Sequence, residues 1–356
     1  MRRNPLLYAR IARLLERFDD WPEAKQRAWR DARLRRMLRA ATRTHYGRRV
    51  GAPASLERWP VLEKEPIRDA AGDFMARSHL LSIAAATSGT TGTPLRLRRS
   101  FTSVVYEQAV LDRLVALGGA SPHSSRIAVM RGDDIKHPTD RSPPYWCLTG
   151  RGRRLLFASN HLERRSLAHF VEALRQFAPD VLFAYPTVLD SLCSLMLAEG
   201  MHLSIPLTLC GSEVLTRATM DAAHAALDTR VIGYYGQAER VAWAFGDPER
   251  GYRFLGTYSV NELRFVETTE DADIYELIGT GLWNDAMPLV RYHTADRFHL
   301  PKGADPLAVA DGRAPIASIA GRSGDYLLSP EGGRLMGISH IPRGVPHVLR
   351  TQFIQE

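Results

Sequence analysis

The stretch ATSGTTGTPLR, from Ala86 to Arg96, places six consecutive residues with a hydroxyl group or no side chain, Ser88 to Thr93, directly after the apolar run LLSIAAA. Small residues let backbone N–H groups approach a ligand, and neighbouring hydroxyls can donate to its oxygens, so the stretch suits a phosphate group. It does not match the GxxxxGKS/T phosphate loop, because no lysine follows Gly92. From these residues alone, a flexible Ser/Thr/Gly linker is equally compatible, so a second feature must decide.

The chain beyond this stretch alternates helical patterns with short apolar runs, which predicts an α/β fold. Four runs are typical of strands: SRIAVM (125–130), DVLFAY (180–185), PLTLC (206–210) and RVIGYYG (230–236). Four segments carry helical periodicity: residues 103–117, 162–177, 187–200 and 217–227. Helices that cross between strands predict a mainly parallel sheet flanked by helices. From about residue 250 the runs YELIGT (275–280), PLVRYHT (288–294) and ASIAG (317–321) predict a smaller β-rich subdomain.

The composition is that of an ordinary globular protein, with 356 residues of which 45% are hydrophobic and 24% charged. A chain of this length can bury a sizeable core in about two or three structural units. Its three cysteines, Cys147, Cys193 and Cys210, lie far apart without a CxxC spacing. This argues against a disulfide framework or a zinc knuckle and favours a reducing cytoplasm.

The formal charge of +8 is unevenly distributed, because residues 1–50 hold 15 Lys and Arg against 5 Asp and Glu, and the rest of the chain sums to −2. An amphipathic helix is predicted at the start of this basic segment. Its apolar face holds Leu7, Ile11, Leu14, Leu15 and Phe18, and another face holds Arg10, Arg13 and Arg17. We expect the helix to pack on its own domain. Contact with an acidic membrane or with phosphates is the alternative, and no signal peptide or membrane span is expected.

The second feature that decides the role of the opening stretch is a set of four later stretches that resemble motifs of the same family. TSGTTGTP (87–94) closely resembles the phosphate loop of the acyl-adenylate-forming enzymes, which include acyl-CoA ligases and adenylation domains. CGSEVL (210–215) resembles their adenine-contacting segment, YYGQAE (234–239) their YGxTE motif, RYHTAD (291–296) their Y-R-T-G-D motif, and GRSGD (321–325) their hinge signature. The five stretches occur in the family's order. Residues 34–50 and 320–335 look most like the phenylacetate-CoA ligase branch.

The resemblance implies roles for the phosphate loop and the metal ligand. Thr87, Ser88, Gly89, Thr90, Thr91 and Gly92 would bind the phosphates of ATP, with Thr90 and Thr91 taking part in catalysis. Glu239 matches the family's Mg²⁺ ligand, and a single carboxylate combined with phosphate oxygens is a usual way to bind this ion. Without the motif, an exposed Glu239 paired with Arg240 would be the simpler interpretation.

The resemblance also implies contacts to the nucleotide and to the acid. Asp296 matches the carboxylate that accepts both ribose hydroxyls, and Arg322 matches the arginine near the hinge that reaches the ribose or phosphate. Gly211, Ser212, Glu213, Tyr235, Gly236 and Gln237 would border the adenine, and Tyr185, Pro186, Gly211 and Tyr235 would line the acyl pocket. From local sequence alone, a turn role for Asp296 and core packing for Tyr185 and Tyr235 stay open.

The sequence departs from the family's pattern in several places. Ala238 stands where the motif has threonine, Ala295 replaces the glycine before Asp296, and Gly324 stands at the hinge aspartate. The family's C-terminal domain is largely absent, because about thirty residues follow GRSGD and the last lysine is Lys302. We expect the sequence to be the large domain of a longer enzyme. The alternative is a natural form that lacks the C-terminal domain.

The domain organisation expected from these features is a basic helical segment (1–50), an adenylate-forming large domain (51–320), and a hinge with the remnant of the C-terminal domain (321–356). The expected function is ATP- and Mg²⁺-dependent activation of an aryl or acyl carboxylic acid to an acyl-adenylate, with transfer to CoA or a carrier-protein thiol. A catalytically impaired nucleotide-binding or partner-binding module is the alternative. Nucleic-acid binding through the basic segment is a third hypothesis, and no nucleic-acid partner is expected.

Overall fold

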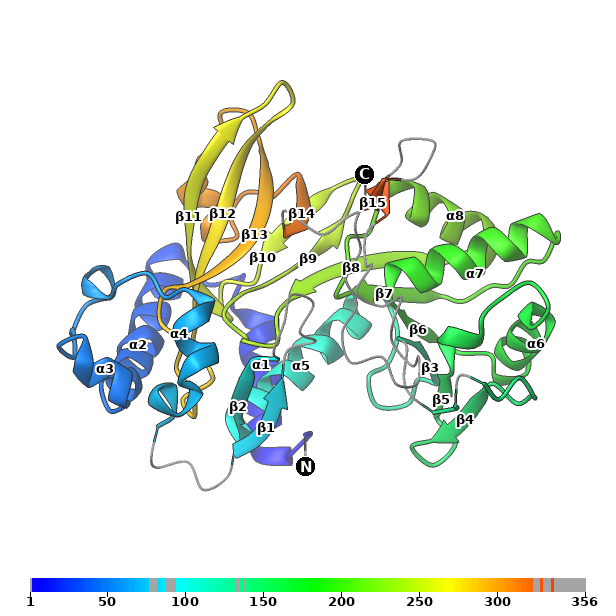
Figure 1. Cartoon of the computed structure of the whole chain (residues 1–356), viewed down its shortest axis with the longest axis horizontal. Helices are drawn as coiled ribbons and strands as arrows, with labels where there is room; N and C mark the ends of the chain where they lie inside the picture. Colours follow the sequence, from blue (N-terminus) through cyan, green and yellow to red (C-terminus); the bar gives the residue numbers. More distant parts are fainter. Residues whose placement is uncertain are drawn as a thin grey trace. The chain divides into compact units, whose positions relative to one another are not determined.

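The computed structural model (Figure 1) describes residues 2–76, 82–86, 94–131, 135–137, 139–322, 327–328 and 334–335. The chain divides into two compact units, each built from separate stretches. The first unit comprises Met1–Leu114, Tyr234–Gly246 and Arg250–Gly321. The second comprises Val115–Gly233, Asp247–Glu249 and Arg322–Glu356.

The first unit begins with helices α1 (Pro5–Arg17), α2 (Glu23–Ala41) and α3 (His45–Arg49). The predicted N-terminal helix is confirmed as α1, which starts where the Asn4 side chain accepts from the N–H groups of Leu6 and Leu7. Ile11, Leu15 and Phe18 are buried, whereas Leu7 and Leu14 of the predicted apolar face are only partly buried. The apolar stripe therefore packs within the fold.

A buried carboxylate ties the start of the chain to helix α5 (Phe101–Leu117). Asp112 is 4% exposed and accepts from Nε and Nη2 of Arg3, both at 2.7 Å, and from the Tyr8 hydroxyl at 2.7 Å. Gln108 Nε2 donates to the same group at 2.9 Å. Such a bidentate, charge-assisted arrangement fixes both position and orientation.

A short antiparallel hairpin precedes α5. Its strands β1 (Ser82–Ala86) and β2 (Arg96–Ser100) pair so that Ala86 lies opposite Arg96. Ala86 and Arg96 thus lie opposite each other on either side of segment 87–93, which is outside the described residues. The short helices of this part of the first unit are η1 (Leu56–Arg58), α4 (Lys64–Asp69) and η2 (Ala71–Phe74).

The predicted β-rich region is a four-stranded sheet in the order β11 (Ser259–Thr268), β12 (Ala272–Gly281), β13 (Tyr292–Pro301) and β14 (Ser318–Arg322). Strands β11 and β12 pair antiparallel, as do β12 and β13. Helix α9 (Pro306–Ala310) follows β13, and β9 (Trp243–Asp247) neighbours β10 (Gly251–Phe254). The prediction of a strand from residue 288 was wrong at its start. Leu289 and Val290 are buried in irregular chain, because an apolar run can fill a core without pairing.

The second unit is built on a mixed sheet that contains β3 (Ile127–Met130), β4 (Trp146–Thr149), β5 (Arg154–Phe157), β6 (Val181–Ala184) and β7 (Leu207–Gly211), and β8 (Arg230–Gly236) follows. The order is β8-β7-β6-β3-β5-β4. Strand β6 is parallel to β3 and to β7, as predicted. Strand β5, which was not predicted, pairs parallel with β3. The antiparallel edge strand β4 was not predicted. Strands β15 (Leu327–Leu328) and β16 (Arg334–Leu335) form a separate antiparallel pair.

Three helices and one 3₁₀ turn accompany this sheet: η3 (Ser159–His161), α6 (Leu167–Phe177), α7 (Pro186–Ala198) and α8 (Arg217–Leu227). The core between sheet and helices contains Phe170, Leu182, Leu189 and Ala223. Helix α6 begins later than predicted from residue 162. Ser166 Oγ donates to the His161 carbonyl and accepts from the Glu163 N–H, which holds this segment in a turn.

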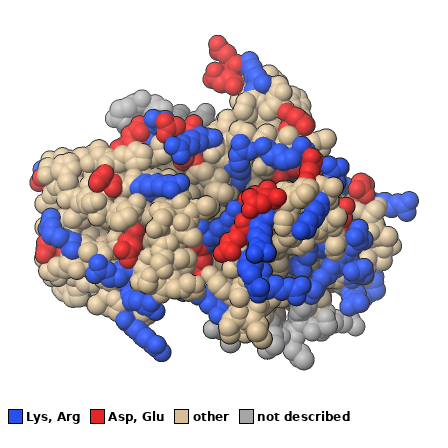
Figure 2. All heavy atoms as spheres, turned by 180° about the vertical axis from the view of Figure 1, so that it is seen from behind, with Lys and Arg blue, Asp and Glu red and all other residues tan. Residues whose placement is uncertain are grey.

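The surface of the chain carries an excess of arginine over the N-terminal helices. Figure 2 shows Lys and Arg side chains crowding the lower right of the face it draws. On α2 and just beyond it, Arg35, Arg39 and Arg43 are exposed, whereas Arg30 pairs with Asp311 at 2.6 Å. None of the helices within the described ranges is long and apolar enough to cross a membrane.

Candidate active site

The YYGQAE stretch ends β8, and the turn between β8 and β9 carries its last three residues, Gln237, Ala238 and Glu239. Its backbone closes where the Arg240 N–H donates to the Gln237 carbonyl at 3.1 Å, and the Ala242 N–H donates to Gln237 Oε1 at 3.2 Å. Arg240 has a φ of +58°, a strained conformation for a residue with a side chain. A Cβ at Gly236 would lie 2.8 Å from Trp243 Cδ1, so glycine is required there for close packing.

Glu239 is presented by this turn as a buried carboxylate, 3% exposed. The hydroxyl of the buried Tyr292, at the start of β13, donates to Glu239 Oε1 at 2.9 Å. Among the described residues, no hydrogen-bond donor approaches Oε2. The alternative of an exposed ion pair with Arg240 is wrong, because the Arg240 guanidinium instead donates to Ser103 Oγ at 3.2 Å. Counting only the residues that the structure describes, one oxygen of Glu239 is held by a hydrogen bond and the other has no donor.

Asp296 lies on β13 and is 6% exposed. The Tyr235 hydroxyl donates to its Oδ2 at 2.6 Å, and Gln237 Nε2 donates in turn to the Tyr235 oxygen. Burial and the negative charge of Asp296 raise the pKa of Tyr235 well above its ordinary value, so the phenol keeps its proton and remains a donor. The structure therefore brings together three residues that the sequence predicted for one site.

The backbone around Asp296 departs from regular strand geometry. The register of β12 and β13 shifts between Glu276 and Ile278, and Ala295 has a φ of +58°. The Thr294 hydroxyl accepts from the Asp296 N–H at 3.1 Å and donates to the Leu277 carbonyl at 3.1 Å. A bulge of this kind re-aims one side chain of a strand. Position 295, where the family has glycine, accordingly holds an alanine in the left-handed region.

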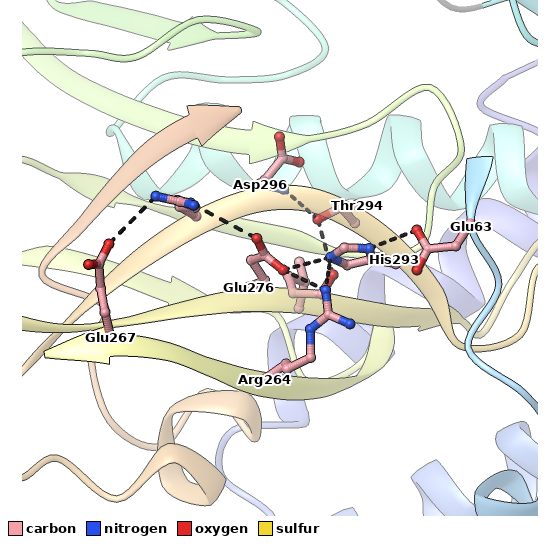
Figure 3. A network of polar contacts seen from close by, with 9 residues as sticks. Glu63, Arg264, Glu267, Glu276, His293, Thr294 and Asp296 are labelled. Atoms are coloured by element: carbon pink, nitrogen blue, oxygen red, sulfur yellow. Dashed lines mark hydrogen bonds and ion pairs between the residues drawn. The ribbon is translucent and has the colours of Figure 1, made fainter. Parts of the chain in front are cut away.

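Sequence reasoning missed a polar network centred on His293 (Figure 3). The ring lies between two carboxylates, with Nδ1 2.8 Å from Glu63 Oε2 and Nε2 3.0 Å from Glu276 Oε2. Arg264 donates to the same Glu276 oxygen at 2.6 Å. Burial of Glu276 opposes its charge, but the hydrogen bonds from Arg264 and His293 lower its pKa overall. The network anchors β13 directly beside Tyr292 and Thr294.

In the second unit, the predicted acyl-pocket and adenine segments meet at the ends of β6 and β7. Glu213 Oε2 accepts from the Thr187 N–H at 3.0 Å and from the Thr187 hydroxyl at 2.7 Å. The carboxylate thereby caps α7, which begins at Pro186 directly after Tyr185. Ser212, between Gly211 and Glu213, has a φ of +73°. Ligands of α/β sheets bind at such carboxyl ends of strands.

Cys210 is the next-to-last residue of β7, which is buried along its whole length, and is 1% exposed. Burial raises the pKa of its thiol to about 12, so the thiol stays protonated at neutral pH. This agrees with a packing role for Cys210. In the described parts of the chain, no group of three or more His, Cys, Asp or Glu side chains could hold a metal ion.

Most of the predicted residues of the phosphate loop and of the hinge stretch lie outside the residues that the structure describes. Thr87, Ser88, Gly89, Thr90, Thr91 and Gly92 lie outside the described residues, as do Ser323 to Asp325 of the hinge stretch. Arg322 is the last residue of β14. Their roles stay predictions.

Comparison with known proteins identifies the family of the chain. The family model described as AMP-binding enzyme matches residues 47–264. Protein CapK of Staphylococcus aureus is 24% identical over 307 residues, which cover 85% of this chain and 67% of that protein.

Solved structures show the same fold. An open conformation of 2-hydroxyisobutyryl-CoA ligase in complex with 2-HIB-AMP and CoA superposes with a TM-score of 0.59 at 16% identity, covering 92% of this chain and 81% of that one. The same ligase in its thioesterification state gives 0.58 at 16% identity, covering 91% and 73%. Because the family model spans more than half of the 356 residues, the chain belongs to the AMP-binding enzyme family, the acyl-adenylate-forming ligases.

Proposed function

We propose that the chain activates a carboxylic acid with ATP and Mg²⁺, forming an acyl-adenylate that is then transferred to the thiol of CoA or of a carrier protein. A carboxylate oxygen of the acid attacks the α-phosphorus of ATP, the bond from that phosphorus to the bridging oxygen breaks, and pyrophosphate leaves. The observation that carries the proposal is Glu239, a buried carboxylate with one oxygen held by Tyr292 and the other free of any described donor.

The donor set suits Mg²⁺. This ion is usually held by one or two carboxylates together with substrate phosphates, and it keeps several waters. Glu239 supplies one such carboxylate, and its charge has no ion-pair partner among the described residues. When bound, the ion would neutralise phosphate charge, and Glu239 would orient it.

Asp296 is the proposed acceptor for the ribose hydroxyls. An ionised carboxylate only accepts hydrogen bonds, and its two oxygens can accept from two neighbouring hydroxyls at once, which suits the paired hydroxyls of a ribose. Tyr235 and Gln237 hold this carboxylate in place. Roles proposed from the resemblance alone are phosphate binding by residues 87–92, a ribose or phosphate contact from Arg322, and adenine contacts from Gly211, Ser212 and Glu213.

The acid is proposed to be aryl or acyl, as in the phenylacetate-CoA ligase branch, with Tyr185 and Pro186 lining its pocket. A cytoplasmic location is also proposed, because the spacing of the three cysteines favours a reducing compartment. What supports Tyr185 and Pro186 is their position at the end of β6, where the capped start of α7 fixes the backbone.

A second candidate is a nucleotide-binding module with impaired catalysis. The observation that favours it is Ala238, whose methyl side chain packs against the buried cluster of Leu62, Val241 and Tyr292 and offers no hydroxyl where the family has one. Loss of one donor to a developing charge costs a factor of about 10² to 10³ in rate.

The test is carboxylate-dependent exchange of labelled pyrophosphate into ATP, with a panel of aryl and fatty acids, alongside calorimetric measurement of ATP binding. Exchange with one acid supports the proposed activity and identifies the substrate class. ATP binding without exchange for any acid supports the impaired module. Absence of ATP binding at millimolar concentration overturns both.

A further inference from the structure

Arg99 joins two parts of the first unit that the sequence separates by about 140 residues. It lies on β2, the strand that continues from segment 87–93. Its Nη2 donates to the backbone carbonyl of Ala238 at 3.1 Å, directly before Glu239. One guanidinium therefore binds the backbone of the turn that presents the proposed metal ligand.

The surroundings of Arg99 are unusual for an arginine. The side chain is partly buried, and its Nε has no hydrogen-bond partner among the described residues. Burial and the nearby positive charge of Arg240 lower the pKa of Arg99, while Glu107 and Glu239 act in the opposite direction. Within the described residues, neither arginine forms an ion pair. Keeping a half-buried cation without a direct counterion costs stability, so a purely structural role explains it poorly.

The hydrogen bond from Arg99 reaches position 238, where this chain has alanine and the family motif has threonine. Position 238 holds alanine, so this residue has no side-chain hydroxyl that could form a hydrogen bond, and Arg99 binds its backbone carbonyl instead. A hydrogen bond from a charged donor is stronger than one between neutral groups. It stabilises the backbone next to Glu239, whose own side chain is held only through Tyr292 among the described residues.

We propose that Arg99 is a positioning residue that holds the Ala238–Glu239 backbone in the geometry in which Glu239 binds Mg²⁺, and thereby links this turn to the strand that follows segment 87–93. The inference rests on the proposed function, because it assumes that Glu239 is the metal ligand. It assigns to Arg99 no contact with substrate.

The neighbouring arginine provides a matched control. Successive side chains of a strand point to opposite faces, and Arg98 is exposed, with Nη1 3.4 Å from the Ser82 carbonyl that it donates to. Arg98→Met and Arg99→Met thus remove the same charge from the same strand. Only the second removes the contact with the turn.

The experiment is calorimetric titration of ATP into the chain at a series of Mg²⁺ concentrations and in EDTA, with thermal unfolding recorded for each variant. Arg99→Met is expected to raise the Mg²⁺ concentration for half-maximal enhancement of ATP binding about tenfold, the effect of losing one charge-assisted hydrogen bond. Its ATP affinity in EDTA is expected to match the wild type. Arg99→Lys is expected to recover part of the loss, and Arg98→Met to show none.

Two results would overturn the inference in distinguishable ways. Equal Mg²⁺ dependence in Arg98→Met and Arg99→Met rejects the role of Arg99 and leaves the metal role of Glu239 intact. Wild-type ATP binding that does not respond to Mg²⁺ rejects the metal role itself and the inference with it. If Arg99→Met does not fold, Arg99→Lys serves as the test variant, with the same expectation of a weaker Mg²⁺ response.

Discussion

At the scale of single residues, Glu239 combines burial with an oxygen that no described group engages. A buried carboxylate normally requires compensating donors, and here one tyrosine hydroxyl supplies the only described one. A bound cation would complete this set, because carboxylate oxygens are ligands that Mg²⁺ takes in proteins. If Glu239 has the proposed role, its substitution should lower activity without lowering stability.

Replacing Glu239 by Gln keeps the shape and an oxygen that can accept from Tyr292, but removes the charge. We expect the rate of pyrophosphate exchange to fall by a factor of about 10² or more, with the unfolding temperature unchanged or raised. The rate of pyrophosphate exchange and the unfolding temperature are measured on the same preparation.

The matched variant is Tyr292→Phe, which keeps the charge and removes one hydrogen bond, and it should lower the rate only about five- to tenfold. The exposed Glu57→Gln is the control for loss of a carboxylate elsewhere. An exchange rate of Glu239→Gln equal to that of Glu57→Gln would contradict the assignment.

At the scale of elements, the attachment of α1 to α5 depends on Asp112 and its donors. Asp112→Asn cannot accept the bidentate bond from Arg3 and leaves part of that charge unpaired. We expect a loss of about 2 kcal/mol in the free energy of unfolding, because the buried group loses charge-assisted hydrogen bonds while the more exposed Arg3 can be rehydrated. Urea unfolding measures it.

Asp19→Asn is the comparison for this prediction. Asp19 pairs with Arg113 at 2.7 Å but is largely exposed, so its loss should cost below about 1 kcal/mol. Equal effects of the two substitutions would show that the Asp112 contacts contribute no more than a surface pair.

Strand β13 carries His299, which leads to a prediction of how the stability of the fold depends on pH. Burial and the positive charge of Arg297 lower the pKa of His299 below its ordinary value of 6.5. The unfolded chain therefore takes up a proton on His299 more readily than the folded chain, and stability falls as the pH drops through 6.5 and below. We expect wild type to lose more unfolding temperature between pH 7.5 and 5.5 than His299→Gln, with exposed His224→Gln behaving as wild type. An equal loss in all three would reject this role for His299.

The elements were largely predictable, and the reasons are local. Strands such as 180–185 and helices such as 217–227 carry their periodicity and end signals within a few residues. The motif residues Tyr235, Gln237 and Asp296 were predictable for one site because a known family orders them. The contacts of Arg99 with Ala238 and of Glu63 with His293 were not, since each joins residues far apart in sequence whose approach depends on the whole packed unit. The same holds for the edge strand β4, which shows no periodicity distinct from a loop.

At the scale of the whole molecule, the net charge of +8 comes from the N-terminal fifty residues, and Arg35, Arg39 and Arg43 are exposed among them. We expect the chain to be retained on a heparin column and released with rising salt, because exposed charges are screened. The triple variant Arg35→Gln, Arg39→Gln, Arg43→Gln should elute at clearly lower salt. A triple substitution of Arg151, Arg153 and Arg164, exposed residues of the second unit, should change elution less. Equal shifts in elution for the two triple variants would show that Arg35, Arg39 and Arg43 contribute no more to heparin binding than exposed arginines of the second unit.

The division of the chain into interleaved stretches has a consequence for inheritance. One uninterrupted run, Val115–Gly233, supplies most of the second unit, including Tyr185, Pro186 and Glu213, while the residues around Glu239 and Asp296 belong to the first. Two recombination events in the gene, one after Leu114 and one before Tyr234, would exchange that run as a block. Given the proposed roles, such an exchange would replace the acid-pocket residues Tyr185 and Pro186 and leave the proposed metal and ribose ligands unchanged.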